Sequence, residues 1–484
     1  MHVLLLLRKN PPVRASVIGV FALASLLWAN VAVAQDGYHR DIFLDGGYSI
    51  TSRDHLAAAD MLGLSYDALA TSDKALQLST IVGSDSDLNG ALLYPDGAPR
   101  YRALYVGGGS ATGHGRSLGD AGRERMRQFF GAGGSYVGSC AGAFLAMLHN
   151  NKADYQADGP YQHYLQLWPG IGQGAGVKQS YHDLIFDDVN HPLVQKYASL
   201  IDGSVNHIRH NYGCRFDPDY YTAPVGTEFI GLVDNPQIPK LHGYYNIAAW
   251  KESAQTGRAV LSCSHPEDAQ SGEKRDLMAA ILSYALDGLG DPRPVKAVLQ
   301  RGEMVQMDSE QTKLGDGQFH YWQLDLPQQV DSLTIDMDGS VEGLELYLQQ
   351  TRYPTRSRFL SFAVDSQNTS KRIKLSKPAS GPWFVGVYGT HTWLNGRAYR
   401  IQANWQLEPA APPTVDAGPQ HSPDMGVVGQ PYEQPAEPIV GLGGCAVVNS
   451  TGSAPLTGSG VCGLALLLVW VLRRQSSATG PETR

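Results

Sequence analysis

The sequence predicts an α/β protein with a doubly wound, mostly parallel sheet, followed by a small all-β sandwich. From residue 41 to about residue 290, short apolar runs alternate with stretches in which apolar residues have helical spacing. That order is typical of a parallel sheet with helices on both faces. After residue 294 the apolar runs are short, partly alternating and separated by Gly, Pro, Asn and Ser, which indicates strands without helices. A chain of 484 residues is also long enough for two or more domains.

The N-terminus has the features of a secretory signal peptide. Three basic residues precede an apolar stretch from residue 17 to residue 28, and small residues at 32–34 offer a cleavage site. We therefore predict a signal peptide over residues 1–34 and export of the protein. An uncleaved anchor helix is the alternative, because the basic region before the apolar stretch is unusually long.

The predicted first domain, residues 35–290, contains strands that run into glycine-rich turns. Residues 41–47 and 102–109 each begin with an apolar run and end in glycines, and helical spacing follows at 55–66 and 122–134. Sites in parallel α/β sheets form at the carboxyl ends of the strands, where these turns lie.

A third strand leads directly to a cysteine. The segment GGSYVGSCAGAFLA, residues 133–146, places Cys140 between an apolar run and a small-residue helix over 142–148. A structural cysteine tolerates bulkier neighbours, whereas a nucleophile on a tight strand-to-helix turn needs small ones, because the backbone folds back sharply. We expect the sulfur of Cys140 to be exposed and reactive. A buried, inert cysteine is the alternative.

A candidate base for this thiol lies near the end of the same domain. An apolar run at 258–263 is followed by His265 and Glu267, and a helix with apolar residues four apart closes the domain. One proline separates the two polar residues, so in an extended segment both side chains project to the same side. A histidine aimed at Cys140 and held by Glu267 meets the requirements for activating a nucleophile.

Donors for a developing oxyanion are also predicted. They are the N–H of Ala141, at the start of a helix, and a backbone N–H from Gly107 or Gly108. A helix N-terminus also lowers the pKa of a thiol.

Other chemistry is disfavoured. The formal net charge is −8 and the folded part has no basic cluster, so we expect no nucleic-acid partner. No spacing of His, Cys, Asp and Glu suggests a metal site, and no phosphate-binding loop is present, so we expect neither metal nor cofactor. His114, His207 and His210 are expected to be surface or packing residues.

The five cysteines cannot all pair within the chain. Cys214 and Cys263 are the only plausible internal pair, but their separation in sequence does not show whether they meet. Their pairing stays open at this point.

The rest of the chain divides into three parts. Residues 298–407 are the predicted β-sandwich, with apolar runs that begin at residues 320, 331, 344, 372, 383 and 399. Residues 408–455 form a predicted Pro- and Gly-rich linker. Residues 456–474 contain an apolar run that is short for a membrane span and ends in two arginines, which would stay cytoplasmic.

The cysteine segment at 133–146 and the sequence VLSCSHPE at 260–267 together resemble the class I glutamine amidotransferase-like superfamily. The fuller cysteine segment is most similar to the amidotransferase-like domain at the N-terminus of fungal-type biotin–protein ligases. The resemblance covers about residues 39–288 and implies an amidotransferase-like α/β fold with flavodoxin-like layers. It implies a triad in which Cys140 is the nucleophile, His265 the base and Glu267 its orienting partner. Gly107, Gly108 and Ala141 fall where the superfamily places its oxyanion loops.

Two further resemblances concern the C-terminal parts. The segment at 339–349 resembles part of the bacterial pre-peptidase C-terminal domain, which is common on secreted hydrolases. The Gly-Gly-Cys at 443–445 and the apolar run after it resemble C-terminal sorting signals of Gram-negative bacteria. That resemblance implies cleavage by an intramembrane protease, with Cys445 as an attachment or lipidation point.

These observations lead to a functional hypothesis. We expect an exported, surface-directed cysteine hydrolase of amide or peptide bonds, with a small-molecule amide or a peptide as its substrate. The loops at 181–193 and 206–221 would set specificity, and the tail would meet a membrane or a sorting protease. A non-catalytic cell-surface binding module that keeps the fold is the alternative. A cell-surface structural protein is a third possibility, but it does not explain Cys140.

Overall fold

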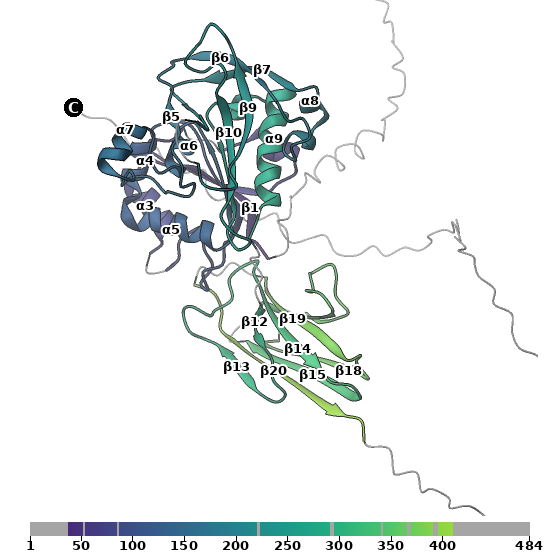
Figure 1. Cartoon of the computed structure of the whole chain (residues 1–484). Helices are drawn as coiled ribbons and strands as arrows, with labels where there is room; N and C mark the ends of the chain where they lie inside the picture. The colour runs from purple at the N-terminus through teal and green to yellow at the C-terminus, as the bar shows by residue number, and fades with distance from the viewer. Residues whose placement is uncertain are drawn as a thin grey trace, which may run out of the picture. The chain divides into compact units, whose positions relative to one another are not determined.

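A computed structural model describes residues 37–409, except 52–53, 85–86, 220–222, 291–294, 340–341, 365–367 and 391–394 (Figure 1). The predicted signal peptide, nearly all of the linker and the C-terminal apolar run lie outside these residues. No helix within them is long and apolar enough to span a membrane.

The α/β part of the chain is built on one mixed sheet, with the strand order β2-β1-β3-β4-β11-β10-β9-β6-β7. The strands from β2 to β11 pair in parallel, whereas those from β11 to β7 pair antiparallel. The prediction of a mostly parallel sheet is therefore wrong for the second half. The strands are β1 (Arg40–Gly46), β2 (Tyr66–Ala70), β3 (Tyr101–Val106), β4 (Ser135–Ser139), β6 (Ser180–Ile185), β7 (Ser204–His210), β9 (Glu228–Asp234), β10 (Tyr245–Lys251) and β11 (Arg258–Ser262).

Connection length explains the antiparallel half. The segments that join β9 to β10 and β10 to β11 are short, whereas a parallel crossover needs about a dozen residues or more. The apolar runs alone do not carry this information, because a strand buried on both faces has the same composition in either direction.

Helices cover both faces of the sheet, as predicted. On β1, Phe43 belongs to one buried cluster, whereas its neighbours Ile42 and Leu44 belong to the cluster on the opposite face. Successive strand residues point to opposite faces, so this alternation requires packing on both. The helices are α2 (Ala57–Met61), α3 (Lys74–Val82), α4 (Ala111–Ser117), α5 (Gly119–Gly131), α6 (Ala141–Ala146), α7 (Lys152–Asp158), α8 (Ala198–Ile201) and α9 (Gly272–Asp287).

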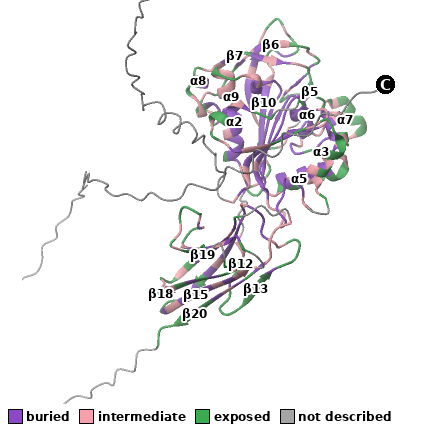
Figure 2. Cartoon of the chain, turned by 180° about the vertical axis from the view of Figure 1, so that it is seen from behind, coloured by how far each residue is buried: buried purple, intermediate pink, exposed green. Residues whose placement is uncertain are grey.

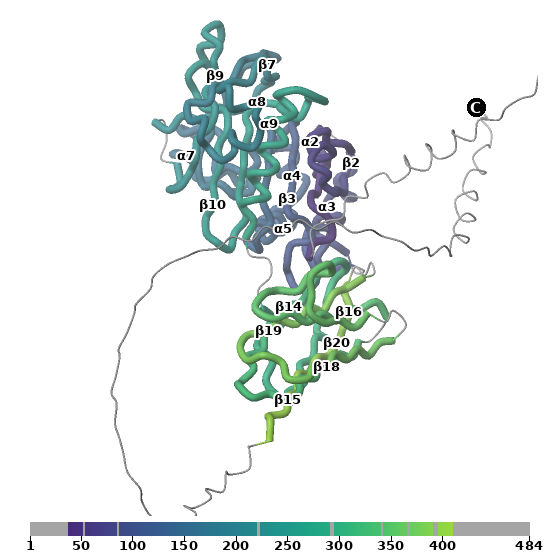
Figure 3. Tube along the Cα trace, turned by 90° about the vertical axis from the view of Figure 1, so that its right-hand side faces the viewer, coloured from purple at the N-terminus to yellow at the C-terminus, as the bar shows by residue number. Residues whose placement is uncertain are grey.

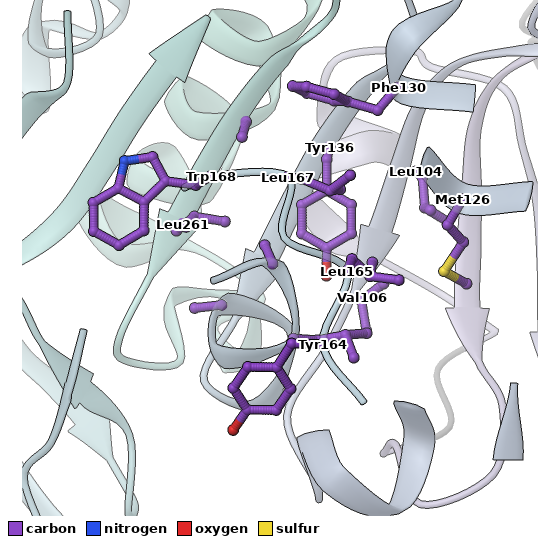
Figure 4. Close-up of a cluster of buried hydrophobic side chains, with 14 of the residues drawn as sticks. Leu104, Val106, Met126, Phe130, Tyr136, Tyr164, Leu165, Leu167, Trp168 and Leu261 are labelled. Carbon is purple, nitrogen blue, oxygen red and sulfur yellow. The ribbon is translucent and has the colours of Figure 1, made fainter. Parts of the chain in front are cut away.

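The two faces bury different helices. Met126 and Phe130 of α5 lie over Leu104 of β3 and Tyr136 of β4 (Figure 4). On the other face α2 and α9, which are far apart in sequence, lie side by side (Figure 3). The strands of the sheet, which lie between the two layers of helices, are largely buried (Figure 2). Each fully buried side chain of this size contributes about 1.5–3 kcal/mol to folding.

Separate β sheets follow the α/β part, as predicted. One has the order β12-β14-β19-β16-β17 and the other β13-β20-β15-β18, and a shared core contains Trp322 from the first and Ile335 from the second. The strands are β12 (Val295–Val298), β13 (Met304–Met307), β14 (Phe319–Leu326), β15 (Val330–Gly339), β16 (Leu344–Gln350), β17 (Ser361–Ala363), β18 (Ser370–Ser376), β19 (Gly381–Gly389) and β20 (Tyr399–Leu407).

Buried polar contacts join these sheets to the α/β part. The carboxylate of Asp96 accepts hydrogen bonds from Lys296 Nζ at 2.5 Å, Gln318 Nε2 at 2.7 Å and His320 Nε2 at 3.1 Å. Burial raises the pKa of Asp96, but hydrogen bonding to His320 and the charges of His320 and Lys296 outweigh it and hold the pKa well below its usual range. The carboxylate is therefore a stable acceptor for all three donors.

Candidate active site

Cys140 occupies a sharp turn between β4 and α6. Its backbone has φ 50° and ψ −103°, a left-handed conformation that residues with a β-carbon rarely adopt. A β-carbon on Gly138 would lie 2.5 Å from the carbonyl carbon of Gly142, and one on Gly142 would lie 2.0 Å from the oxygen of Val106. Larger residues therefore do not fit here. The predicted tight strand-to-helix turn is confirmed, together with the reason for its small residues.

The thiol of Cys140 is buried, so the expectation of an exposed sulfur is wrong. The residue is 5% exposed, and its Sγ donates a hydrogen bond to the backbone oxygen of Asn211 at 3.5 Å. Asn211 directly follows β7, in a loop that the sequence predicts to be a specificity loop. This loop therefore covers the sulfur.

His265 and Glu267 meet directly after β11. His265 Nδ1 lies 2.9 Å from Glu267 Oε1, and the side chains are 6% and 1% exposed. Pro266–Asp268 form a short 3-10 helix, so the predicted extended segment is wrong, although the predicted pairing is present. The 3-10 turn brings Glu267 back toward the imidazole ring. The backbone N–H of His265 donates to the oxygen of Arg209 at 2.9 Å, which fixes the start of the turn.

The electrostatics of this site favour a protonated imidazole. Burial lowers the pKa of His265, but the neighbouring Cys140 side chain and the hydrogen bond to Glu267 outweigh burial and raise the pKa from 6.5 to about 10. Because Glu267 occupies Nδ1, Nε2 is the ring nitrogen left for the thiol. An imidazolium held between a carboxylate and a thiol is the arrangement that supports an ion pair with a thiolate.

Two of the three predicted oxyanion residues adjoin these groups. A β-carbon on Gly108 would lie 2.5 Å from His265 Cε1, and Ala141 begins α6 directly after Cys140. Across the described part of the chain, neither of their N–H groups donates to a backbone carbonyl. Gly107 instead accepts a hydrogen bond from Gly142 at 3.0 Å and so ties the loop to α6. The role of Gly107, Gly108 and Ala141 as oxyanion donors stays a prediction.

Gly108→Ala should displace the imidazole of His265. The new methyl group needs the space that His265 Cε1 now fills, and the hydrogen bond from Nδ1 to Glu267 restrains that ring. We expect alkylation of Cys140 by iodoacetamide to slow at least fivefold, with a loss of about 1 kcal/mol in the free energy of unfolding, because overpacking strains a buried side chain. Gly131→Ala is the matched control, because nothing lies within 4 Å of its β-carbon. Equal alkylation rates in the two variants would contradict this placement of Gly108.

A buried polar cluster that the sequence patterns did not predict lies next to the segment before His265. Ser264 Oγ lies 2.8 Å from Asn246 Nδ2 and 3.2 Å from both His182 Nε2 and His210 Nδ1. Burial lowers the pKa of His182 to about 4 and that of His210 to about 3. Both rings are therefore neutral, and each can donate one hydrogen bond and accept another. The hydrogen bonds to Ser264 hold the backbone directly before His265. In the sequence, apolar Ile208 lies two residues before His210, so period-two alternation along β7 is the signal that could have placed His210 on the buried face.

The three histidines expected to be surface or packing residues agree with that expectation. His114 is fully buried, with Nε2 at 2.8 Å from Asp45 Oδ2, and His210 is buried in the cluster above. His207 is exposed and stacks on Tyr181 with ring centroids 4.2 Å apart.

Cys214 and Cys263 form a disulfide, which resolves the pairing that the sequence left open. The bond joins the short strand β8 (Cys214–Arg215) to the end of β11, so it links the loop that covers Cys140 to the segment that carries His265. Cys140 is the free cysteine among the described residues. Those residues also contain no group of three or more His, Cys, Asp or Glu side chains that could hold a metal ion.

Residues 98–284 match the family model described as biotin-protein ligase, N terminal. This part of the chain is amidotransferase-like. The match contains Cys140, His265 and Glu267, and it supports the superfamily that the two sequence segments resemble. None of the curated proteins matches the chain.

Three solved structures illustrate the likeness of each part. A glutamine amidotransferase is 18% identical, with 50% of this chain and 98% of that chain covered and a TM-score of 0.31. A putative GMP synthase component from Thermoplasma acidophilum is 10% identical, with coverages of 53% and 96% and a TM-score of 0.31. The pre-peptidase C-terminal domain of a collagenase from Bacillus anthracis is 12% identical, with coverages of 23% and 98% and a TM-score of 0.18. At such TM-scores these likenesses assign neither a function nor a substrate.

Proposed function

We propose that the protein is an exported cysteine hydrolase of amide or peptide bonds. Cys140 is the nucleophile, His265 the base and Glu267 the residue that orients the base. The single observation that carries the proposal is the strained turn at Cys140, which lies beside a buried His265–Glu267 hydrogen bond. Strained residues cluster at functional sites, and a nucleophile, a base and an orienting group are the required set.

The chemistry would proceed in two steps. The thiolate of Cys140 attacks the carbonyl carbon of the amide, and the imidazolium of His265 gives its proton to the leaving nitrogen as the acyl-enzyme forms. A water molecule then attacks the thioester, with neutral His265 as the base that accepts its proton. The N–H groups of Gly108 and Ala141 would stabilise the oxyanion in both steps.

Turnover by the purified full-length chain tests this proposal. Amides of γ-glutamate and a peptide library are incubated with the protein, and ammonia, amine or new peptide termini are measured. We expect Cys140→Ser to abolish turnover while circular dichroism and the melting temperature stay unchanged, since the hydroxyl is similar in size and a far poorer nucleophile. Turnover by Cys140→Ser at the wild-type rate would rule out the mechanism.

A non-catalytic binding module is the second candidate. The observation that favours it is the contact between the Cys140 thiol and Asn211, because a covering loop hinders access by a substrate. The binding module would turn over no amide, and its Cys140→Ser variant would bind the same ligands as the wild type.

Export is part of the proposal, and the Cys214–Cys263 disulfide supports it. Disulfides persist in oxidising compartments and are rare in the cytosol. We also propose that the C-terminal segment is processed by a sorting protease at the cell surface of a Gram-negative bacterium.

Mass spectrometry of the mature protein tests the predicted processing at both ends. We expect an N-terminus near Gln35 and a C-terminus near Gly444 or Cys445. An intact chain that ends at Arg484 in the cytoplasmic fraction would contradict both processing events.

A further inference from the structure

A pocket lies beside α7, on a part of the chain that the proposed chemistry does not use. Its volume is about 510 Å³, and its lining includes neither Cys140 nor His265. The α7 segment carries many exposed residues (Figure 2). The lining residues that matter here are Thr112, His149, Asp154, Asp158, Tyr161 and Tyr164.

The acidic side of this pocket comes from one helix face. Asp154 and Asp158 are four residues apart on α7, so their carboxylates lie on the same side, and both are exposed. Within the described ranges, neither side chain has an ion pair or a hydrogen bond. Two like charges one helical turn apart repel each other, and a cation bound between them removes that repulsion.

His149 supplies a hydrogen-bond donor to the same pocket. The residue is 5% exposed, and its Nδ1 accepts a hydrogen bond from the backbone N–H of Asn151 at 3.0 Å. Nδ1 therefore carries no proton, and Nε2 carries it as a donor. Nε2 has no partner among the residues that the structure describes, although the ring is buried and lines the pocket. A ligand oxygen in the pocket can accept a hydrogen bond from this N–H.

Aromatic rings complete the lining. Tyr161 packs edge-to-face against His149 with ring centroids 5.5 Å apart, and against Tyr164 at 4.8 Å. Such rings bind the alkyl part of a ligand and attract a cation at their faces.

We propose that this pocket binds a basic amino-acid residue, free or within a peptide. Its ammonium or guanidinium group lies between Asp154 and Asp158, its carbonyl oxygen accepts a hydrogen bond from His149 Nε2, and its alkyl chain packs on Tyr161. This site goes beyond the proposed hydrolase, because binding requires no reaction at Cys140.

Calorimetric titration of the full-length Cys140→Ser protein tests the proposal without interference from turnover. Three probes separate the parts of the site. Lysine amide has the side-chain ammonium and the carbonyl, norleucine amide lacks the side-chain ammonium, and cadaverine has an ammonium at each end but no carbonyl. We expect norleucine amide to bind at least tenfold more weakly than lysine amide, and cadaverine about fivefold more weakly.

The double variant Asp154→Asn and Asp158→Asn should weaken lysine amide binding at least tenfold. Glu252→Gln and Glu303→Gln is the matched control, because it removes two exposed carboxylates elsewhere and so the same net charge. The proposal is overturned if lysine amide does not bind, if norleucine amide binds equally well, or if both double variants lose the same affinity. Cadaverine binding as tightly as lysine amide would remove His149 from the site. A failure to find amide turnover would leave all of these outcomes unaffected.

Discussion

His265→Ala is expected to slow the alkylation of Cys140 by iodoacetamide at pH 6 by at least tenfold. The pKa of His265 is about 10 in the folded chain, so the imidazole is cationic at pH 6 and favours a thiolate beside it. Alanine removes that cation and with it the electrostatic support for a thiolate. Peptide mapping by mass spectrometry measures the rate at Cys140 separately from Cys445 and Cys462.

Two further variants serve as comparisons. Glu267→Gln should slow alkylation less than His265→Ala, because an amide oxygen can still orient Nδ1 while the cation remains. His207→Ala removes an exposed histidine on the surface and should leave the rate unchanged. If His265→Ala and His207→Ala give the same rate, the small residues around Cys140 serve packing alone, and the binding module becomes the better proposal.

The pH dependence of this site has a definite sign. Because the folded chain binds the His265 proton more tightly than the unfolded chain, its contribution to stability is fully present below pH 6.5 and is lost as the pH rises through about 10. His265→Ala should therefore lower the free energy of unfolding more at pH 6 than at pH 10, as urea denaturation at the two pH values measures.

Replacing Cys214 and Cys263 together with serine should lower the free energy of unfolding by about 4 kcal/mol. The cross-link closes a loop of 49 residues, and loop-closure entropy of that size predicts this loss. Urea denaturation of the variant and of the oxidised wild type measures the difference. The loop over Cys140 should also loosen, so we expect Cys140 to react faster with iodoacetamide in the variant.

The matched control for the disulfide is Ser72→Ala and Ser271→Ala, which alters two small exposed residues without removing a cross-link. A loss below about 1 kcal/mol in the cysteine variant would mean that the covering loop is held mainly by other contacts. One of them is the close approach of Gly213 to the Cys263 oxygen, where a β-carbon would lie at 1.9 Å.

The sequence was sufficient to predict the parallel half of the sheet and the turn at Cys140, because both depend on local patterns. Glycines at Gly138 and Gly142 report a close backbone approach that any larger residue would prevent. The antiparallel half was missed because an apolar strand has no direction in its composition. The burial of Cys140 was missed because Asn211 is distant in sequence and meets the thiol through its backbone oxygen.

The supporting cluster was also beyond sequence reasoning. Ser264, Asn246 and His182 come from three separate segments, and only the fold brings their hydrogen bonds together. The pairing of His265 with Glu267 was easier, because two residues in a short segment meet in either an extended or a 3-10 conformation.

The backbone at Cys140 implies a trade-off between stability and activity at a single position. A residue with a β-carbon at φ 50° costs the fold about 1–3 kcal/mol, a strain that glycine would avoid. Selection for stability alone would therefore favour glycine here, and nothing in the packing of the turn requires a larger side chain. Under the proposed mechanism, the fold accepts this strain in exchange for a sulfur at this position.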